Sequence, residues 1–420
     1  MSQNLEKLTA YEILEKRQIK DLNSEGYLLK HKRTGAHITL LLNDDENKVF
    51  YIGFRTPPKD STGVAHILEH SVLCGSKNFP VKDPFIELAK GSLNTFLNAM
   101  TYPDKTVYPV ASCNDTDFKN LVHVYLDAVF YPNIYKEEKI FRQEGWHYEL
   151  ENKEDDLKIN GVVYNEMKGA LSSPEAIMED KAMEELFPDT TYGVESGGDP
   201  EVIPTLSFRE FSEFHRRFYH PSNSYIYLYG DMDIDETLKF IDQEYLSHFD
   251  ARNVYSAVKT QSPLPKRKIV EAPFGISENE SLEKKTIHAL YIALNDHITT
   301  EESLAFKILS YVLVDMDGAP LKKAVLDAGI GNDVSSAYGD SYKQPVWTIE
   351  VTGSEIDKRE KFISTVDLVL RNLALDGIDR NMLEAALNRT EFILRENDFQ
   401  GKPKGLLYGV RAMDLWLYDR

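Results

Sequence analysis

The first half of the chain mixes short extended runs with apolar stripes of helical period. The runs TGAHITLLLND and KVFYIGFRT, near residues 27–54, are rich in β-branched and aromatic residues and predict paired strands. The segment VAHILEHSVLCGS predicts a helix that stops near Gly75, because its apolar residues recur at helical spacing: Val64, Ile67, Leu68 and Val72. The segment SLNTFLNAMTYPDKTVYPVAS holds two extended runs around a Tyr-Pro-Asp-Lys turn and predicts a hairpin.

The next hundred residues continue the mixture of helix and strand. The charged residues 151–160 predict a surface loop, and Gly161 then opens a helix in GVVYNEMKGA. Ser207 and Glu210 form a capping-box pattern that predicts a helix through about Phe218. The run SYIYLYGD, with its alternating aromatic residues, predicts a strand.

A composition change divides the chain. Residues 256–283 concentrate Pro, Gly, Ser and charge without periodicity, so we expect a linker between domains 1–255 and 284–420. A pattern resembling the first unit then restarts at a shift of about 240 residues. We therefore expect an α+β fold of two homologous domains, each a mixed sheet with helices mainly on one face. The final segment GLLYGVRAMDLWLYDR continues an amphipathic helix pattern without a cap, from which we expect a fragment of a longer chain.

Composition narrows the function classes. The chain has 420 residues, 42% hydrophobic residues and a formal net charge of -20, so its field disfavours a nucleic-acid partner. It contains neither a membrane-spanning apolar run nor a secretory signal, which predicts no membrane partner. Two cysteines suit a reducing compartment, and we expect a cytoplasmic location.

The pentapeptide His66-Ile67-Leu68-Glu69-His70 is the strongest chemical signal. On a helix, residues four apart share a face, so both imidazoles can grip one cation. Glu69 lies on the same face and can reach a water without being a ligand. This is the inverted order of the H-E-x-x-H zinc-protease motif. A pair of histidines on an ordinary helix is the alternative.

A catalytic zinc site needs a third protein ligand and an open position. Glu144, Glu149 and Glu166 all qualify by residue type. Glu166 is favoured, because apolar neighbours seat its helix and Gly169-Ala170 allow close backbone approach, but the residues alone leave the choice open. Glu144, at a predicted helix end, suits a supporting or surface carboxylate better.

Successive blocks of the chain resemble the presequence protease branch of the pitrilysin/insulysin metallopeptidase clan. From about residue 25 to 250 they follow in the family's order: HILEHSVLCGS, SLNTFLNAMTYPDKTVYPVAS, VYLDAVFYP, QEGWHYELE, GVVYNEMKGA, SGGDP and FHRRFYHPSNSYIYLYGD. The linker and the second unit match that family's second domain. The fold implied is the one shared with LuxS and the mitochondrial processing peptidase.

The resemblance implies a zinc-dependent metalloendopeptidase that degrades short unstructured peptides. It implies one Zn²⁺ bound by His66, His70 and Glu166, with Glu69 as general base. It also implies an edge strand at residues 93–101 to which peptide substrates add, with Asn98 and Ala99 as substrate contacts. The family's enzymes are about twice as long and close like a clamshell, with an Arg and a Tyr supplied by the second half. This chain therefore resembles the N-terminal half, and its own missing C-terminal half is an expected partner.

Two other function classes remain open. The first is a non-enzymatic binding scaffold of the same fold, which the intact HILEH motif disfavours. The second is metal-dependent hydrolysis of a non-peptide amide. We do not expect Cys74 to be a metal ligand or the SGGDP segment to bind phosphate. We expect His215 and His220 to have structural roles.

Overall fold

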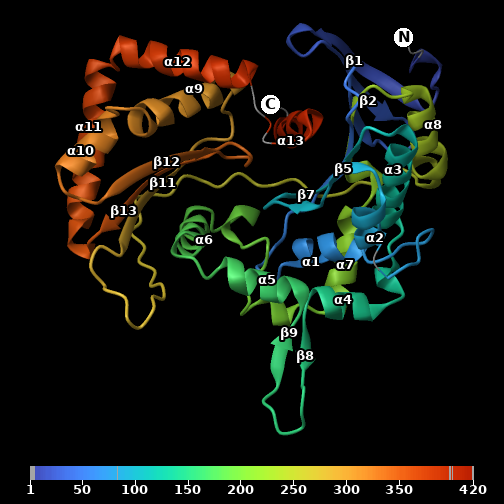
Figure 1. Ribbon diagram of the computed structural model, residues 1–420, viewed down its shortest axis with the longest axis horizontal. Coiled ribbons are helices and arrows are strands. Elements are labelled where there is room, and N and C mark those ends of the chain that lie inside the picture. The colour runs from blue at the N-terminus through green and yellow to red at the C-terminus, as the bar shows by residue number, and fades with distance from the viewer. Residues whose placement is uncertain (1–4, 83, 397–398, 400, 419–420) are drawn as a thin grey trace. The chain divides into compact units, whose positions relative to one another are not determined.

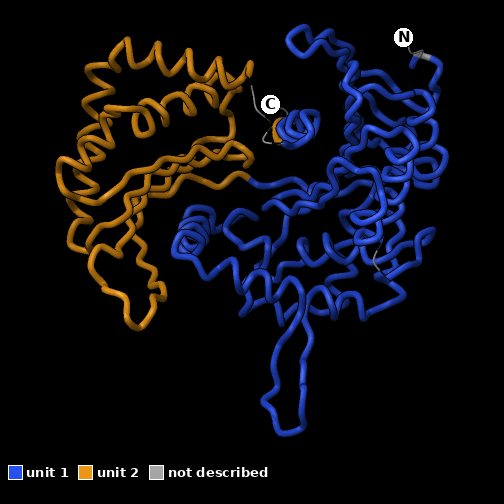
Figure 2. The backbone as a smooth tube through the Cα atoms, in the orientation of Figure 1, with its two compact units in different colours: residues 1–259, 401–413 blue, residues 260–400, 414–420 orange. Residues whose placement is uncertain are grey.

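The computed structural model describes residues 5–82, 84–396, 399 and 401–418. By its internal contacts the chain forms two compact units, residues 1–259 with 401–413 (unit 1) and residues 260–400 with 414–420 (unit 2), coloured separately in Figure 2. Both units combine helices and sheets (Figure 1), so the α+β prediction is confirmed. None of the helices in the described residues combines the length and the apolar character needed to cross a bilayer.

Unit 1 is built on a mixed eight-stranded sheet. Its order is β1-β2-β3-β10-β4-β7-β5, with β6 also paired to β7; β10 runs parallel to β3 and antiparallel to β4. The strands are β1 (Tyr11–Ile19), β2 (Ser24–His31), β3 (His37–Leu42), β4 (Lys48–Arg55), β5 (Asn94–Leu97), β6 (Met100–Thr101), β7 (Lys105–Ser112) and β10 (Ser224–Gly230). The predicted hairpin at residues 92–112 thus forms β5, β6 and β7. Strand β5 lies at one edge of the sheet.

Helices cover one face of this sheet. Alternate residues of β4, including Phe50, Ile52 and Phe54, belong to one apolar core together with residues of α1, α3, α7 and α8. The helices of unit 1 are α1 (Val64–Val72), α2 (Pro84–Gly91), α3 (Asp115–Phe130), α4 (Glu138–Glu144), α5 (Val162–Ala170), α6 (Pro174–Leu186), α7 (Phe208–Phe218) and α8 (Ile234–Glu244). A small hairpin of β8 (His147–Glu149) and β9 (Lys158–Asn160) precedes α5 (Figure 1), so part of the predicted loop at residues 151–160 is strand.

The opposite face of the sheet is covered by α13 (Lys404–Trp416). The hydroxyl of Tyr51 donates a 2.9 Å hydrogen bond to the carbonyl of Gly409. A Cβ added at Gly409 would lie 2.6 Å from the Tyr227 ring, and one at Gly405 would lie 2.1 Å from the Tyr229 ring. The helix therefore approaches the tyrosine rings so closely because glycine stands at both contacts. Residues 401–413 belong to unit 1, whereas the sequence pattern predicts them in domain 284–420; the predicted domain boundaries stay a prediction.

Unit 2 has a three-stranded sheet of its own. Strands β11 (Thr286–Ala293), β12 (Asp333–Gly339) and β13 (Val346–Ser354) are antiparallel neighbours in the order β11-β13-β12. Both pairings of this sheet are antiparallel, so the sheet is not of the mixed type expected for each domain. A core that includes Leu321, Ile349 and Phe362 lies between this sheet and its helices. The helices are α9 (Thr300–Ser310), α10 (Pro320–Asp327), α11 (Arg359–Asp376) and α12 (Arg380–Arg395). Residues 251–283, which contain the predicted linker, form neither helix nor strand.

A buried histidine in unit 1 gives a prediction for stability. His215 is 3% exposed; its Nε2 lies 3.0 Å from the carbonyl oxygen of Val129, and its Nδ1 lies 2.6 Å from the hydroxyl of Tyr135. A neutral ring satisfies both, with Nε2–H donating and Nδ1 accepting. The pKa of His215 is lowered to about 3, chiefly by burial; the hydrogen bond to the Val129 carbonyl opposes this shift, and the charge of Arg216 adds to it. His215 is thus a structural residue, as expected.

Between pH ~6.5 and about 3, His215 is protonated in the unfolded chain and neutral in the folded chain. The free energy of unfolding should therefore fall as the pH drops from about 6.5 towards 3, with this residue contributing up to ~1.4 kcal/mol per pH unit. Urea unfolding of the wild type and His215→Gln between pH 7.5 and 4.5 measures this, and the glutamine variant should lack the contribution. His297→Gln, at a side chain that is 89% exposed, is the control and should keep the wild-type slope. Equal slopes in all three proteins would contradict the prediction.

Candidate metal centre

Helix α1 presents the two histidines and the glutamate of HILEH. Ile67 and Leu68 are fully buried and fix the helix in the core, while the His66 and His70 side chains remain partly accessible. The two imidazole rings have their centroids 5.0 Å apart, as the spacing of four predicts. The helix thus has one face in the core and one polar face.

A glycine pair seats the start of α1 against a later loop. Gly63 has φ of 67°, and a Cβ there would lie 2.7 Å from the carbonyl oxygen of Gly197. The loop is also held to the segment before α1, because the Asp199 N–H donates to the Ser61 carbonyl at 2.8 Å. The SGGDP segment therefore supports α1, which gives it a structural role in place of the rejected phosphate site.

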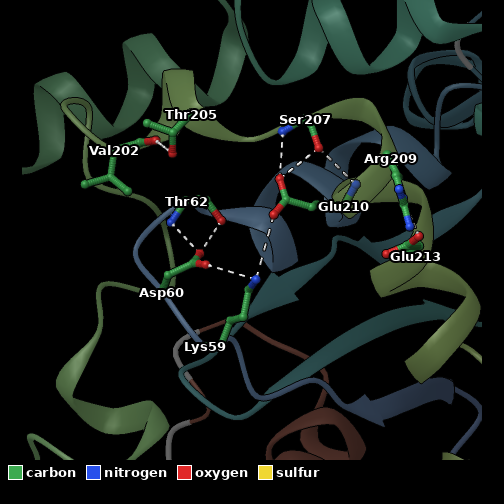
Figure 3. Close-up of polar contacts among 9 residues, drawn as sticks. All are labelled: Lys59, Asp60, Thr62, Val202, Thr205, Ser207, Arg209, Glu210 and Glu213. Carbon is green, nitrogen blue, oxygen red and sulfur yellow. Dashed lines mark hydrogen bonds and ion pairs between the residues drawn. The ribbon is translucent and has the colours of Figure 1, made fainter.

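The segment that enters α1 is further tied to the start of α7 (Figure 3). Asp60 accepts hydrogen bonds from the backbone and hydroxyl of Thr62, at 3.2 and 2.6 Å. Lys59 lies between Asp60 and Glu210, at 3.7 and 3.8 Å, and Glu210 closes the capping box with Ser207. The ion pairs of Lys59 are exposed and contribute little energy. Their effect is to connect the segment before α1 with the start of α7.

Glu166 comes from α5. Val163 and Met167 bury the other side of this helix, and the Glu166 side chain is 53% exposed. One carboxylate oxygen, Oε2, lies 3.8 Å from His66 Nε2 and 3.7 Å from His70 Nε2. A Cβ at Gly161 would lie 2.1 Å from the carbonyl oxygen of Gly145. Glycine at position 161 therefore lets α5 begin directly against the end of α4, beside α1.

Both imidazoles have their second nitrogen occupied. His66 Nδ1 lies 3.0 Å from the Gly197 carbonyl oxygen, and His70 Nδ1 lies 3.4 Å from Glu144 Oε2. Each Nδ1–H can donate to its oxygen, which leaves both Nε2 atoms as acceptors facing Glu166. This is the outer-shell arrangement common to metal-binding histidines.

Glu144 supports His70 from a buried position. It is 6% exposed, and its Oε1 accepts from the Gln143 amide at 2.9 Å and from the Cys74 thiol at 3.5 Å. Burial raises the pKa of Glu144, but the hydrogen bond with His70 and the charge of His70 outweigh it, so the pKa is lowered. Burial lowers the pKa of His70, yet Glu144 and the neighbouring carboxylates raise it overall. The suggested supporting role of Glu144 agrees with this geometry.

Glu69 lies deeper than the histidines and is 8% exposed. Its Oε2 accepts a 2.6 Å hydrogen bond from the hydroxyl of Thr101. Burial raises the pKa of Glu69, and the hydrogen bond from Thr101 and the two imidazoles oppose this rise without cancelling it. A carboxyl group of raised pKa, close to the cluster, is suited to accept and return a proton.

The three expected ligands fit one zinc ion. Within the described part of the chain, His66, His70 and Glu166 are the one group of three such side chains whose ligand atoms all lie within 4.8 Å of one another. Ligands at about 2.1 Å in a tetrahedron would be about 3.4 Å apart, close to the observed 3.7 and 3.8 Å. Glu149, the other candidate, instead accepts a hydrogen bond from Asn160 in the β8–β9 hairpin.

Asn98 and Ala99 connect β5 to β6 at the sheet edge. The Asn98 N–H donates to the Pro109 carbonyl at 3.3 Å, and its own carbonyl accepts from the Tyr125 hydroxyl at 3.1 Å. The Asn98 side chain is exposed, whereas Ala99 packs against the core. Their assignment as substrate contacts stays a prediction, and for Ala99 such a contact would have to use the backbone.

The sequence did not predict the roles of three residues that contact the candidate site: Thr101 bonds Glu69, Tyr125 bonds Asn98 and Gly197 bonds His66. Thr101 falls in the expected edge segment, two residues after Ala99, and this proximity was the available signal for it. No signal in the sequence connects Gly197 with His66, because the two are 131 positions apart.

Models of two domains of one family match the chain. The model described as insulinase (peptidase family M16) matches residues 49–193, and the peptidase M16 inactive domain matches residues 205–390. A Clostridium perfringens relative, protein HypA, is 51% identical over 98% of this chain and 42% of its own length. Presequence protease 1 of Arabidopsis thaliana is 44% identical over 96% of this chain and 37% of its own length.

Solved structures share the fold. A pitrilysin structure has a TM-score of 0.68 at 16% identity, over 97% of this chain and 42% of the pitrilysin chain. The M16 inactive domain of Pseudomonas fluorescens also has a TM-score of 0.68, at 14% identity, over 94% of this chain and 88% of that chain. The chain spans about two fifths of the length of the curated relatives it matches, with 42% and 37% covered in the two cases above.

Proposed function

Because this chain belongs to the insulinase (peptidase M16) family, we propose that it carries the zinc site of a metalloendopeptidase. The observation that carries the proposal is the convergence of His66 Nε2, His70 Nε2 and a Glu166 carboxylate oxygen on one point. Two imidazoles and one carboxylate form a known donor set of catalytic zinc sites, which keep a further coordination position open. When bound, zinc supplies Lewis acidity toward water and toward the substrate carbonyl.

Proton transfer during the reaction would be carried out by a residue of this chain, Glu69. Glu69 takes a proton from the attacking water and later returns it to the nitrogen of the leaving amine, so the carboxylate is restored. Its Oε2 is engaged by Thr101, which leaves Oε1 for the proton. His66 and His70 would hold the metal through Nε2, each oriented through its Nδ1 by the Gly197 carbonyl or by Glu144.

We propose short unstructured peptides as the substrates. Strand β5 is at an edge of the sheet, so an extended peptide can add to it through backbone hydrogen bonds. We propose Asn98 as a side chain that meets such a peptide; its exposure immediately after β5 supports this. An unstructured peptide can take up the extended backbone conformation that this pairing requires.

We also propose that full activity needs a complementary C-terminal half, which would supply the Arg and the Tyr that the family resemblance implies. The relatives' greater length supports this proposal. Zinc binding should need unit 1 alone, because all three proposed ligands and Glu69 lie in it.

The proposal is tested by peptide cleavage and metal analysis. The zinc-loaded chain, mixed with the C-terminal part of a close relative, should cleave a short unstructured peptide. A chelator should abolish cleavage, and added zinc should restore it. The chain alone should bind about one zinc ion and cleave weakly or not at all. Zinc binding with no cleavage in any combination would favour a binding scaffold, and cleavage of a non-peptide amide alone would favour the other alternative. Full activity of the chain alone would overturn the composite-site proposal.

A further inference from the structure

The hydroxyl of Thr101 donates a hydrogen bond to the Glu69 carboxylate. The distance from Thr101 Oγ1 to Glu69 Oε2 is 2.6 Å, a length typical of a hydrogen bond to an ionised oxygen. Among the described residues, no other hydrogen-bond donor engages this carboxylate, and Oε1 therefore has none. Thr101 thus determines which oxygen of Glu69 is available for proton transfer.

Thr101 itself is held on both sides. It pairs with Thr106 across β6 and β7, and the following turn closes with a 2.8 Å hydrogen bond from the Tyr102 N–H to the Lys105 carbonyl. The turn residue Asp104 is fully buried, pairs with Lys105 at 3.2 Å and accepts from the Tyr192 hydroxyl at 2.8 Å. A satisfied buried polar network of this kind rigidifies its surroundings. The position of the Thr101 hydroxyl is consequently set by the fold.

The same short segment leads to the expected substrate edge. Ala99 precedes Thr101 by two residues, and the Asn98 backbone is fixed by Pro109 and Tyr125. One rigid segment thus connects two places: the sheet edge to which a peptide would add, and the Glu69 carboxylate, which would accept the proton.

We propose that Thr101 is a positioning residue that holds the Glu69 carboxylate in register with the substrate-binding edge of the sheet. This inference rests on the proposed function. It assigns Thr101 no contact with the reacting atoms, since it acts through Glu69. Loss of the hydroxyl should leave Glu69 free to rotate, so that fewer encounters have productive geometry.

The test compares Thr101→Val, Thr101→Ser and Thr106→Val in the zinc-loaded enzyme with its complementary half. Valine has the shape of threonine without the donor, and serine keeps the donor. Thr106 is the matched control, because it is the cross-strand partner of Thr101 and its hydroxyl bonds with that of Thr56 at 2.8 Å rather than with Glu69. Thr101→Val should lower kcat by about 10- to 100-fold, because a misplacement of about 1 Å at a catalytic group can cost about 10²-fold. Its KM and zinc affinity should stay within about two-fold. Thr101→Ser should restore most of kcat, and Thr106→Val should leave it unchanged.

A second measurement does not depend on activity. In the zinc-free chain, the infrared carboxylate band of Glu69 is assigned by its loss in Glu69→Gln. This band should shift in Thr101→Val and keep its position in Thr101→Ser and Thr106→Val. An unshifted band in Thr101→Val, or equal kcat values for Thr101→Val and the wild type, would overturn the inference. Absence of cleavage by the wild type together with the expected band shift would instead count against the proposed function alone, leaving the contact established.

Discussion

Replacing Glu69 with glutamine is expected to lower kcat for peptide cleavage by about 10²- to 10⁴-fold, the usual contribution of a general base. The amide has nearly the same shape as the carboxylate, and its oxygen can still accept the hydrogen bond from Thr101. It cannot take up a proton from water at neutral pH. The loss should therefore be in the chemical step, with zinc binding and folding retained. Steady-state kinetics, elemental analysis and thermal unfolding of the same preparation measure the three properties.

Glu384→Gln provides the matched control for this experiment. Glu384 lies on α12 in unit 2, where it forms an exposed ion pair with Arg380, so the same chemical change should leave kcat unaltered. Wild-type kcat in Glu69→Gln would remove the proposed base from the mechanism. Loss of zinc in that variant would mean that Glu69 contributes to metal binding and would require a different ligand set.

Removing one imidazole is expected to empty the metal site. His70→Ala should reduce bound zinc from about one ion per chain towards none, because a catalytic site has only three protein ligands to begin with. Peptide cleavage should disappear with the metal. Glu166→Gln should also weaken zinc binding strongly, since an amide carries no negative charge to offset that of the ion. Competition with a coloured chelator measures both affinities.

Two variants make this test specific. His297→Ala removes an imidazole that is 89% exposed in unit 2 and should keep the wild-type zinc content. Glu149→Gln removes the competing carboxylate and should also keep it, since Glu149 is paired with Asn160. Strong zinc binding in Glu166→Gln combined with its loss in Glu149→Gln would exchange the assignments of these two residues.

The local part of the site was predictable from the sequence, because its geometry follows from helical periodicity. His66 and His70 are four positions apart, which places both rings on one face of the helix wherever α1 lies in the fold. The third position was not decided by the residues themselves, which left Glu144, Glu149 and Glu166 open. Packing separates them, because the close approach at Gly145 and Gly161 brings α5 to α1.

The supporting contacts were less accessible to sequence reasoning. The Gly197 carbonyl and the Thr101 hydroxyl reach α1 through loops and strand pairing, and such long-range contacts leave no periodic signal. The position of α13 was missed for the same reason. Its amphipathic stripe showed that one face is buried, but a stripe does not identify the surface that buries it.

The position of α13 also determines how the polypeptide responds to a break. The chain leaves unit 1 after residue 259, returns to it for residues 401–413 and then continues into unit 2 with residues 414–420, so most of unit 2 lies between two parts of unit 1 in the sequence. A protease that nicks the irregular stretch between residues 251 and 283 would therefore produce two fragments without separating them. The C-terminal fragment would remain bound through α13, whose glycines sit against Tyr227 and Tyr229. Such a nicked protein should still migrate as one particle under native conditions.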